Sequence, residues 1–239
     1  MKFGNITGPV VNLISGISDF VYPKVCILSG LKIPESNSNS YILDEKISLL
    51  ERATGEDLIA MREKTGLKLS FSVFAFRNDG PVQTVIHEMK YKGMKNIGIF
   101  LGEYLKSELK KLGVNIQDKF HICVPIPLHE TKKRERGYNQ SDYICKGVTS
   151  NTDIEITKNL LIRVKKTQTQ TKLSFEERKK NMKNAFIFNP RFVNKLNGVN
   201  AILVDDVITS GSTLKEAISV LKKGGIGEIL VLTSAVVKS

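Results

Sequence analysis

Two adjacent aspartates, Asp205 and Asp206, follow a short apolar run and precede a stretch of hydroxyl side chains around one glycine. Backbone N–H groups at the start of a helix, together with small hydroxyl side chains, favour binding of a phosphate group. The carboxylates cannot bind that phosphate, but they suit sugar hydroxyls or a metal ion carried by the same ligand. The pattern therefore predicts a site for a ribose 5-phosphate. The hydroxyl stretch consists of Thr209, Ser210, Gly211, Ser212 and Thr213.

Other interpretations of the acid pair are the metal site of a P-loop NTPase and that of a receiver domain. The chain contains no G-x-x-x-x-G-K-[ST] motif, which argues against the first. A receiver carries its acid pair near the start of the chain, whereas this pair lies near the end. The hydroxyls could also be plain helix caps, but one cap explains one hydroxyl and not four.

A second candidate site is a basic stretch that follows the apolar segment 121–128. A basic loop between a strand and a helix predicts an anion site, where a pyrophosphate group would bind; the alternative is a solvated basic turn. Lys90 and Lys92, at the end of an expected helix, are further cations that could reach an anionic substrate. The candidate residues of the loop are Lys132, Lys133, Arg134, Arg136 and Gly137.

A third stretch, residues 159–184, is rich in cations and has a polar centre without a core pattern. We expect an exposed, mobile loop that closes over a charged substrate and excludes water, or that contacts nucleic-acid phosphates. A lone helical histidine is more often structural than functional, so His87 receives no role. The candidate loop residues are Lys165, Lys166, Thr167, Gln170 and Arg178.

Alternating strands and helices must position these groups. Residues 201–204 predict a buried strand that ends at the acid pair, 214–223 a helix stopped by Gly224, and 228–237 a second strand. This order predicts a parallel sheet with its ligand crevice at the carboxyl end of the first strand. Further strands are expected over 69–76, 121–128 and 185–188, and helices over 81–93, 97–112 and 138–148. The prolines of 121–128 predict an end or edge strand.

The composition is that of a globular protein of 239 residues with a net charge of +12. Such a charge suits pyrophosphate, nucleotides or nucleic acid, although abundant lysines on solvated faces would produce the same excess. Three widely spaced cysteines argue against a disulfide framework and for a reducing cytoplasm. No apolar run reaches the roughly 18 residues of a membrane span, and the start does not resemble a signal peptide.

The segment VDDVITSGST, from Val204 to Thr213, resembles the motif of type I phosphoribosyltransferases that binds phosphoribosyl pyrophosphate (PRPP). Four further blocks resemble the ComF family of competence proteins: KYKG at 90–93, VPIPL at 124–128, RERGYNQ at 134–140, and the stretch 163–186. The resemblance implies an α/β fold, in which a type I phosphoribosyltransferase-like parallel sheet flanked by helices occupies 67–239.

Residues 1–66 would form a small extension. ComF proteins carry a zinc ribbon there, but Cys26 alone resembles a ribbon ligand in this chain, so we expect no zinc.

The resemblance also implies a mechanism. PRPP would bind as a magnesium complex, with its 5-phosphate on 209–213, its ribose at Asp205 and Asp206, and its pyrophosphate near 132–136. The carboxylates would stabilise an oxocarbenium-like transition state, and the protein itself would hold no metal. The acceptor is not identified.

Two functions stay open. The first is a PRPP-dependent transferase, linked by the resemblance to DNA uptake in natural transformation. The second is a non-catalytic competence accessory protein that binds single-stranded DNA. The partners implied are PRPP, single-stranded DNA, a competence helicase and a second copy of the chain, in the cytoplasm and without membrane insertion.

Overall fold

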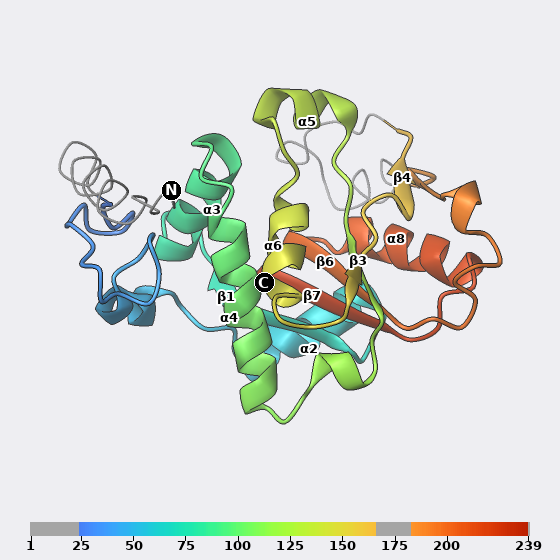
Figure 1. Ribbon diagram of the computed structural model, residues 1–239, viewed down its shortest axis with the longest axis horizontal. Helices are drawn as coiled ribbons and strands as arrows, with labels where there is room; N and C mark the ends of the chain where they lie inside the picture. The colour runs from blue at the N-terminus through green and yellow to red at the C-terminus, as the bar shows by residue number, and fades with distance from the viewer. Residues whose placement is uncertain (1–23, 166–182, 239) are drawn as a thin grey trace, which may run out of the picture. The chain divides into compact units, whose positions relative to one another are not determined.

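The computed structural model describes residues 24–165 and 183–238 (Figure 1). The chain divides into two compact units, Met1–Leu49 and Leu50–Ser239. This division falls earlier in the chain than the boundary expected between residues 66 and 67. The reason is that helix α2 (Gly55–Thr65) packs against strands of the larger unit and so belongs to it.

The larger unit is built on a five-stranded parallel sheet with the strand order β1-β7-β6-β2-β3. The central strands β6 and β7 are apolar and buried over most of their length, as expected for a parallel sheet covered on both faces. The α/β fold predicted from the sequence is therefore confirmed. The strands are β1 (Ser70–Phe76), β2 (Ile122–Pro125), β3 (Glu155–Ile156), β6 (Ala201–Ile208) and β7 (Ile229–Val237).

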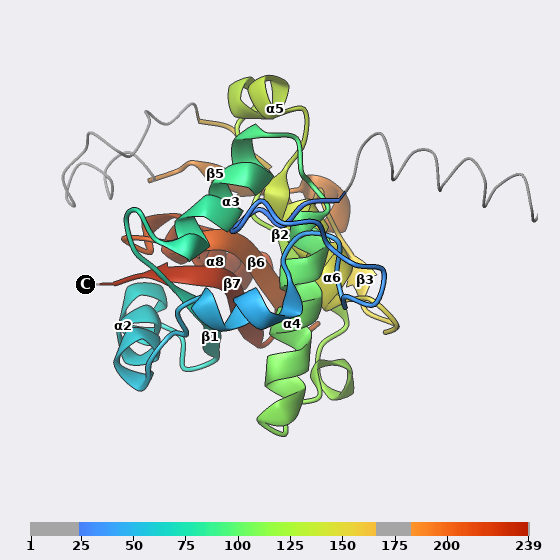
Figure 2. The same cartoon turned by 90° about the vertical axis from the view of Figure 1, so that its left-hand side faces the viewer.

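Helices cover both faces of this sheet (Figures 1 and 2). Helices α3 (Pro81–Tyr91), α4 (Ile97–Lys111) and α6 (Gln140–Val148) pack on one face. Helix α8 (Ser212–Lys223) and α2 pack on the other, together with a small antiparallel pair, β4 (Leu161–Arg163) and β5 (Phe186–Phe188). The connections from β1 to β2 and from β2 to β3 run one way across the sheet, and that from β6 to β7 runs the other way. Right-handed crossovers therefore place their helices on opposite faces.

The direction of these connections reverses between the neighbouring strands β6 and β2. In open parallel sheets the ligand crevice forms outside the carboxyl ends of the strands at such a reversal. The carboxyl end of β6 carries the acid pair, and that of β2 leads into the basic stretch. The topology therefore brings the first two candidate sites to one place.

Of the two alternatives expected from the prolines, the edge strand is wrong, whereas Pro125 does stand at the end of strand β2. It pairs with β6 on one side and, at Ile122 and Cys123, with β3 on the other. The pairing with β3 ends before Pro125, so the missing N–H of this proline leaves no ladder bond unmade on that side. The next residue, Ile126, donates to the carbonyl of Val204 at 2.9 Å.

The smaller unit is described from residue 24 onward. It contains a bridge between Val25 and Lys32, a turn in which Cys26 accepts from the N–H of Gly30 at 2.7 Å, and the 3-10 helix η1 (Asp44–Leu49). Two further 3-10 turns, η2 (Ile116–Asp118) and η4 (Pro190–Phe192), belong to the larger unit.

In the part of the chain that the structure describes, no helix combines the length and the apolar character that a membrane crossing requires. Over the same residues, no three His, Cys, Asp or Glu side chains gather as a metal site. All three cysteines are buried and none forms a disulfide. A chain without zinc stays a prediction.

Candidate functional site

A cavity of about 470 Å³ lies at the carboxyl ends of β1, β2, β6 and β7. Both aspartates line it, and so do Thr209, Gly211 and Thr213 from the hydroxyl stretch. Cations from three separate elements line the same space. They are Lys90 from α3, Lys132 and Arg136 from α5 (Glu130–Arg136), and Arg163 from β4. One cavity thus brings together residues of two candidate anion sites that the sequence predicted separately.

The acid pair lies within β6 and not beyond its end, because β6 continues to pair with β7 as far as Ile208. Each carboxylate is oriented by the backbone that follows it. Asp205 Oδ1 accepts from the N–H of Asp206 at 2.9 Å, and Asp206 Oδ1 accepts from that of Val207 at 2.7 Å. Two side chains of the cavity are therefore fixed before any ligand arrives.

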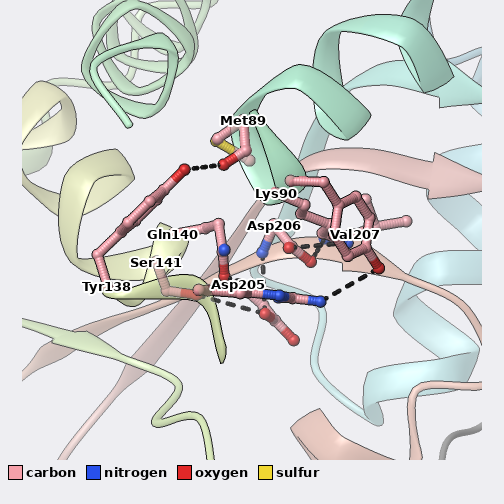
Figure 3. A network of polar contacts seen from close by, with 10 residues as sticks. Met89, Lys90, Tyr138, Gln140, Ser141, Asp205, Asp206 and Val207 are labelled. Carbon is pink, nitrogen blue, oxygen red and sulfur yellow. Dashed lines mark hydrogen bonds and ion pairs between the residues drawn. The ribbon is translucent and has the colours of Figure 1, made fainter. Parts of the chain in front are cut away.

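The two aspartates meet different partners, which come from two helices on the same face of the sheet. Figure 3 shows Lys90 of α3 reaching Asp206, with 2.9 Å between Lys90 Nζ and Asp206 Oδ2. The hydroxyl of Ser141, on α6, donates to Asp205 Oδ1 at 3.4 Å. The acid pair thus connects the two helices that border the cavity.

The environment of Asp205 perturbs its ionisation. The pKa of Asp205 is raised to about 7, mainly by burial and then by the negative charge of Asp206, while the Asp206 N–H and the cations Lys90 and Arg163 act in the opposite direction. A carboxyl group with a pKa near neutrality in a cavity is typical of a functional site.

The variant Asp205→Asn is expected to flatten the dependence of stability on pH. The folded-state pKa of about 7 exceeds the ordinary value of 3.8, so the folded protein binds this proton more tightly than the unfolded chain does. The protonated Asp205 therefore stabilises the folded state; this stabilisation is fully present below about pH 4 and is lost as the pH rises through about 7. Urea unfolding over this range should show a decline in the wild type that is smaller in the variant. The decline should persist in Asp153→Asn, whose carboxylate is exposed; an equal decline in Asp205→Asn would contradict the prediction.

The hydroxyl stretch only partly faces the cavity. Helix α8 begins at Ser212 and its N-cap is Gly211, so none of the four hydroxyl side chains occupies the N-cap position. Gly211 has a φ of 73°, and a Cβ there would lie 2.4 Å from the carbonyl oxygen of Lys64, so this position requires glycine. The hydroxyls of Ser210 and Ser212 lie 3.0 Å apart and bond to each other. The members of the stretch that line the cavity are Thr209, Gly211 and Thr213, beside the start of α8.

The basic stretch corrects a second expectation, because it forms the short helix α5 and not a loop. Gly137 ends the helix in the left-handed conformation, with a φ of 77°. Residues four apart share a helix face, so Lys132 and Arg136 both line the cavity. Lys133 and Arg134 are exposed and do not line it.

The cations of the cavity are crowded together. Burial lowers the pKa of Lys132, and the charges of Arg136, Arg163 and Lys90 lower it further, against a smaller opposite effect of Asp206. An anionic ligand among these groups would relieve their mutual repulsion. The charge of this cavity wall therefore favours an anionic ligand.

Gln140 and Ser141 are site residues that the sequence analysis missed. They are the first residues of α6 and line the cavity. Gln140 is 1% exposed, and its Oε1 accepts from Arg136 Nη1 at 3.0 Å. Its Nε2 has no hydrogen-bond partner among the described residues. A buried donor of this kind at a helix start suits an anionic ligand. The available signal was the position of Gln140 at the end of the RERGYNQ block.

The third stretch contributes one residue that was not singled out. Arg163 ends β4 and lines the cavity; burial lowers its pKa, and the charge of Asp205 opposes that effect. Lys165 is exposed and does not line the cavity. His87, which received no role, lines it, whereas Lys92 is exposed and does not. The remaining candidates, Lys166, Thr167, Gln170 and Arg178, lie outside the described residues.

Comparison with known proteins identifies related chains. Residues 154–237 match the family model described as "Phosphoribosyl transferase domain". This segment includes β6, α8 and β7, and therefore the acid pair and the hydroxyl stretch.

Relatives extend beyond that segment. The chain is 42% identical over 152 residues to "Competence protein F" of Haemophilus influenzae, which covers 63% of this chain and 66% of that protein. It is 30% identical over 155 residues to "DNA utilization protein YhgH" of Salmonella typhimurium, an alignment that covers 63% of this chain and 65% of that protein. It is 27% identical over 165 residues to "Competence protein ComFC" of Bacillus subtilis, covering 69% and 62%. The similarity thus spans just under two thirds of the length of these relatives.

Proposed function

Because the chain belongs to the ComF family and carries a phosphoribosyltransferase-like domain, we propose that it binds PRPP and transfers the phosphoribosyl group to an acceptor. The observation that carries the proposal is that one cavity contains the acid pair, the start of α8 and four cations. PRPP is a pentose with a phosphate at one end and a pyrophosphate near the other. Its parts require these three kinds of subsite within one cavity.

Each part of the ligand has a matching group of residues. The 5-phosphate would contact Thr209, Gly211 and Thr213 at the start of α8. The ribose hydroxyls would donate to the carboxylates of Asp205 and Asp206. The pyrophosphate would lie among cations and donors that also line the cavity: Lys132, Arg136, Gln140 and Ser141.

Magnesium fits this set of donors when it arrives with the substrate. The ion prefers oxygen ligands, keeps several waters, and is usually held by one or two carboxylates together with substrate phosphates. Asp205 and Asp206 supply two carboxylates, and no third acid joins them as a metal site within residues 24–165 and 183–238. When bound, magnesium offsets negative charge on the departing pyrophosphate.

The residues of the chain would act by electrostatics. As the bond between the anomeric carbon and the pyrophosphate oxygen breaks, positive charge develops on the ribose. The carboxylates of Asp205 and Asp206, fixed by backbone N–H groups, stabilise that charge. Lys132 and Arg136 stabilise the negative charge that moves to the pyrophosphate.

Isothermal titration of the chain with PRPP and Mg²⁺ tests the first step. We expect binding, and we expect Lys132→Met to weaken it by about tenfold or more, since a hydrogen bond to a charged group contributes about 1.5–3 kcal/mol. Lys133→Met is the matched control, because it removes the same charge from the exposed side of α5. No heat of binding at a ligand concentration on the order of millimolar would reject the proposal.

A second candidate function is binding of single-stranded DNA, in line with the relatives named for competence and DNA utilization. Tyr143 supports it: Lys95 Nζ and Lys146 Nζ lie 5.8 Å and 4.7 Å from the centre of its ring, and Tyr138 contacts it edge-on. Aromatic rings with adjacent cations bind bases and phosphates of single strands. An affinity for single-stranded DNA that falls steeply as the salt concentration rises, and that is lower in Tyr143→Leu than in the wild type, would support this function. An affinity for single-stranded DNA that does not depend on salt would count against it.

The biological setting is also part of the proposal. The names of the relatives place those proteins in competence and DNA utilization, which motivates a role for this chain in handling incoming DNA. A competence helicase and a second copy of the chain are the partners that we propose, in the cytoplasm.

A further inference from the structure

The ion pair between Lys90 and Asp206 points to a control on the acid pair itself. We propose that Lys90 is a built-in cation that occupies Asp206 in the free protein and leaves it when a polyanionic ligand enters the cavity. Free divalent metal ions would then be kept from the acid pair, and only metal that arrives with the substrate would reach it. This inference rests on the proposed binding of PRPP, although the role of the ion pair can be tested without that ligand.

The ion pair is sheltered from solvent. Lys90 Nζ lies 2.9 Å from Asp206 Oδ2, and the two side chains are only 20% and 14% exposed. Every other Lys or Arg ion pair found among the described residues has at least one partner that is 30% exposed or more. Salt screens sheltered pairs much less than exposed ones, so Lys90 competes effectively with other cations for this carboxylate.

The residues on both sides of Lys90 are anchored to the end of α5 and to the segment that follows it. The carbonyl of Met89 accepts a hydrogen bond from the hydroxyl of Tyr138, and the Met89 side chain is fully buried (Figure 3). The ring of Tyr91 lies 5.1 Å from the guanidinium carbon of Arg136, whose Nη2 donates to the Tyr91 hydroxyl at 3.4 Å. Lys90 is therefore placed by the fold and is not a surface lysine that meets Asp206 by chance.

The ammonium group of Lys90 also has an alternative position within reach. A smaller cavity of about 260 Å³ adjoins the main one, and Lys90, Lys132 and Arg136 line both. An anion held by Lys132 and Arg136 would offer Lys90 a partner of higher charge than a single carboxylate. Movement of the ammonium group to that anion would free Asp206 for a ribose hydroxyl or for the accompanying metal ion.

The test uses Mn²⁺ alone as the probe and follows the free-ion signal by electron paramagnetic resonance. We expect the wild-type chain to bind Mn²⁺ weakly and Lys90→Gln to bind it about tenfold more tightly, because Asp206 loses its competing cation. The matched control is Lys92→Gln, two residues further along, which removes the same charge from an exposed position outside the cavity. It should bind Mn²⁺ within about twofold of the wild type.

Two kinds of result, concerning first the single variants and then the double variant, would overturn the inference. One is an unchanged Mn²⁺ affinity in Lys90→Gln, or an equal gain in Lys92→Gln, which would indicate an effect of net charge. The other is a gain that survives in the double variant Lys90→Gln with Asp206→Asn, which would place the ion elsewhere. Thermal unfolding checks that the variants fold. If Lys90→Gln does not fold, Lys90→Met, which keeps the aliphatic part of the side chain, replaces it in the same measurement.

Failure of this inference is distinguishable from failure of the proposed function. The Mn²⁺ measurement contains no PRPP, so a gain in Lys90→Gln supports the role of Lys90 even when the wild type does not bind PRPP. Conversely, a wild type that binds PRPP while Lys90→Gln gains no affinity for Mn²⁺ would retain the proposed function and reject the control by Lys90.

Discussion

The double variant Asp205→Asn with Asp206→Asn is expected to lose PRPP affinity by about 100-fold or more. Each hydrogen bond between a ribose hydroxyl and a carboxylate contributes about 1.5–3 kcal/mol, so losing two corresponds to at least two factors of ten. The measurement is titration with PRPP and Mg²⁺. The fold should tolerate the change at Asp205, whose pKa of about 7 shows that a neutral side chain suits the site, and thermal unfolding checks the effect of the change at Asp206, which removes the partner of Lys90.

A matched control separates this effect from a change in overall charge. The pair Asp118→Asn with Asp153→Asn removes two exposed carboxylates from the same chain and should bind PRPP as the wild type does. Affinity of the Asp205 and Asp206 variant within about threefold of the wild type would show that the ribose does not lie at the acid pair. Loss of PRPP binding with transformation intact would favour the DNA-binding function.

The part of the site that the sequence could predict is the part encoded by neighbouring residues. The acid pair, the hydroxyl stretch and the helix after them occupy one continuous segment, in which a buried strand and an apolar helical face are both visible. Lys90 and Arg163 reach the same cavity from distant segments. Their placement follows from the strand order, in which β1 and β2 flank the central pair β6 and β7, and no local pattern contains that order.

The helix formed by the basic stretch, the second candidate site, could not be predicted from the local sequence. Helix α5 has seven residues and no buried side chain, so it carries no apolar periodicity from which a helix could be predicted. The remaining signal was Gly137, which ends the helix in the left-handed conformation. Helical spacing would have separated Lys132 and Arg136, which line the cavity, from Lys133 and Arg134, which do not.

The boundary between the two units also could not be predicted from a local sequence pattern. Helix α2 is mostly polar and begins with a capping box formed by Thr54 and Asp57. Only Met61 and a few neighbours are buried, against α8 and the sheet. The close approach of Lys64 to Gly211 places this helix directly behind the N-cap of α8. Tertiary packing thus assigns α2 to the larger unit.

The variant Gly147→Ala is expected to destabilise the fold by about 3 kcal/mol or more, at the upper end for overpacked cores. Helices α4 and α6 cross closely at Gly102 and Gly147, and a Cβ on Gly147 would lie 2.0 Å from the carbonyl oxygen of Ile99 and 2.7 Å from the backbone nitrogen of Glu103. Backbone atoms cannot turn aside as a side chain can, so the two helices must separate. Urea unfolding measures the loss.

Gly55→Ala is the matched control, because a Cβ there meets no atom within 4 Å and the residue begins helix α2. It should leave stability unchanged or raise it by up to about 1 kcal/mol, the difference in helix propensity between alanine and glycine. Helix α6 also carries Gln140 and Ser141 into the cavity, so separation of the helices should weaken PRPP binding as well. If Gly147→Ala unfolded at the same urea concentration as the wild type, the close crossing of α4 and α6 would be wrong, and with it the position of Gln140 and Ser141, where we propose that the pyrophosphate binds.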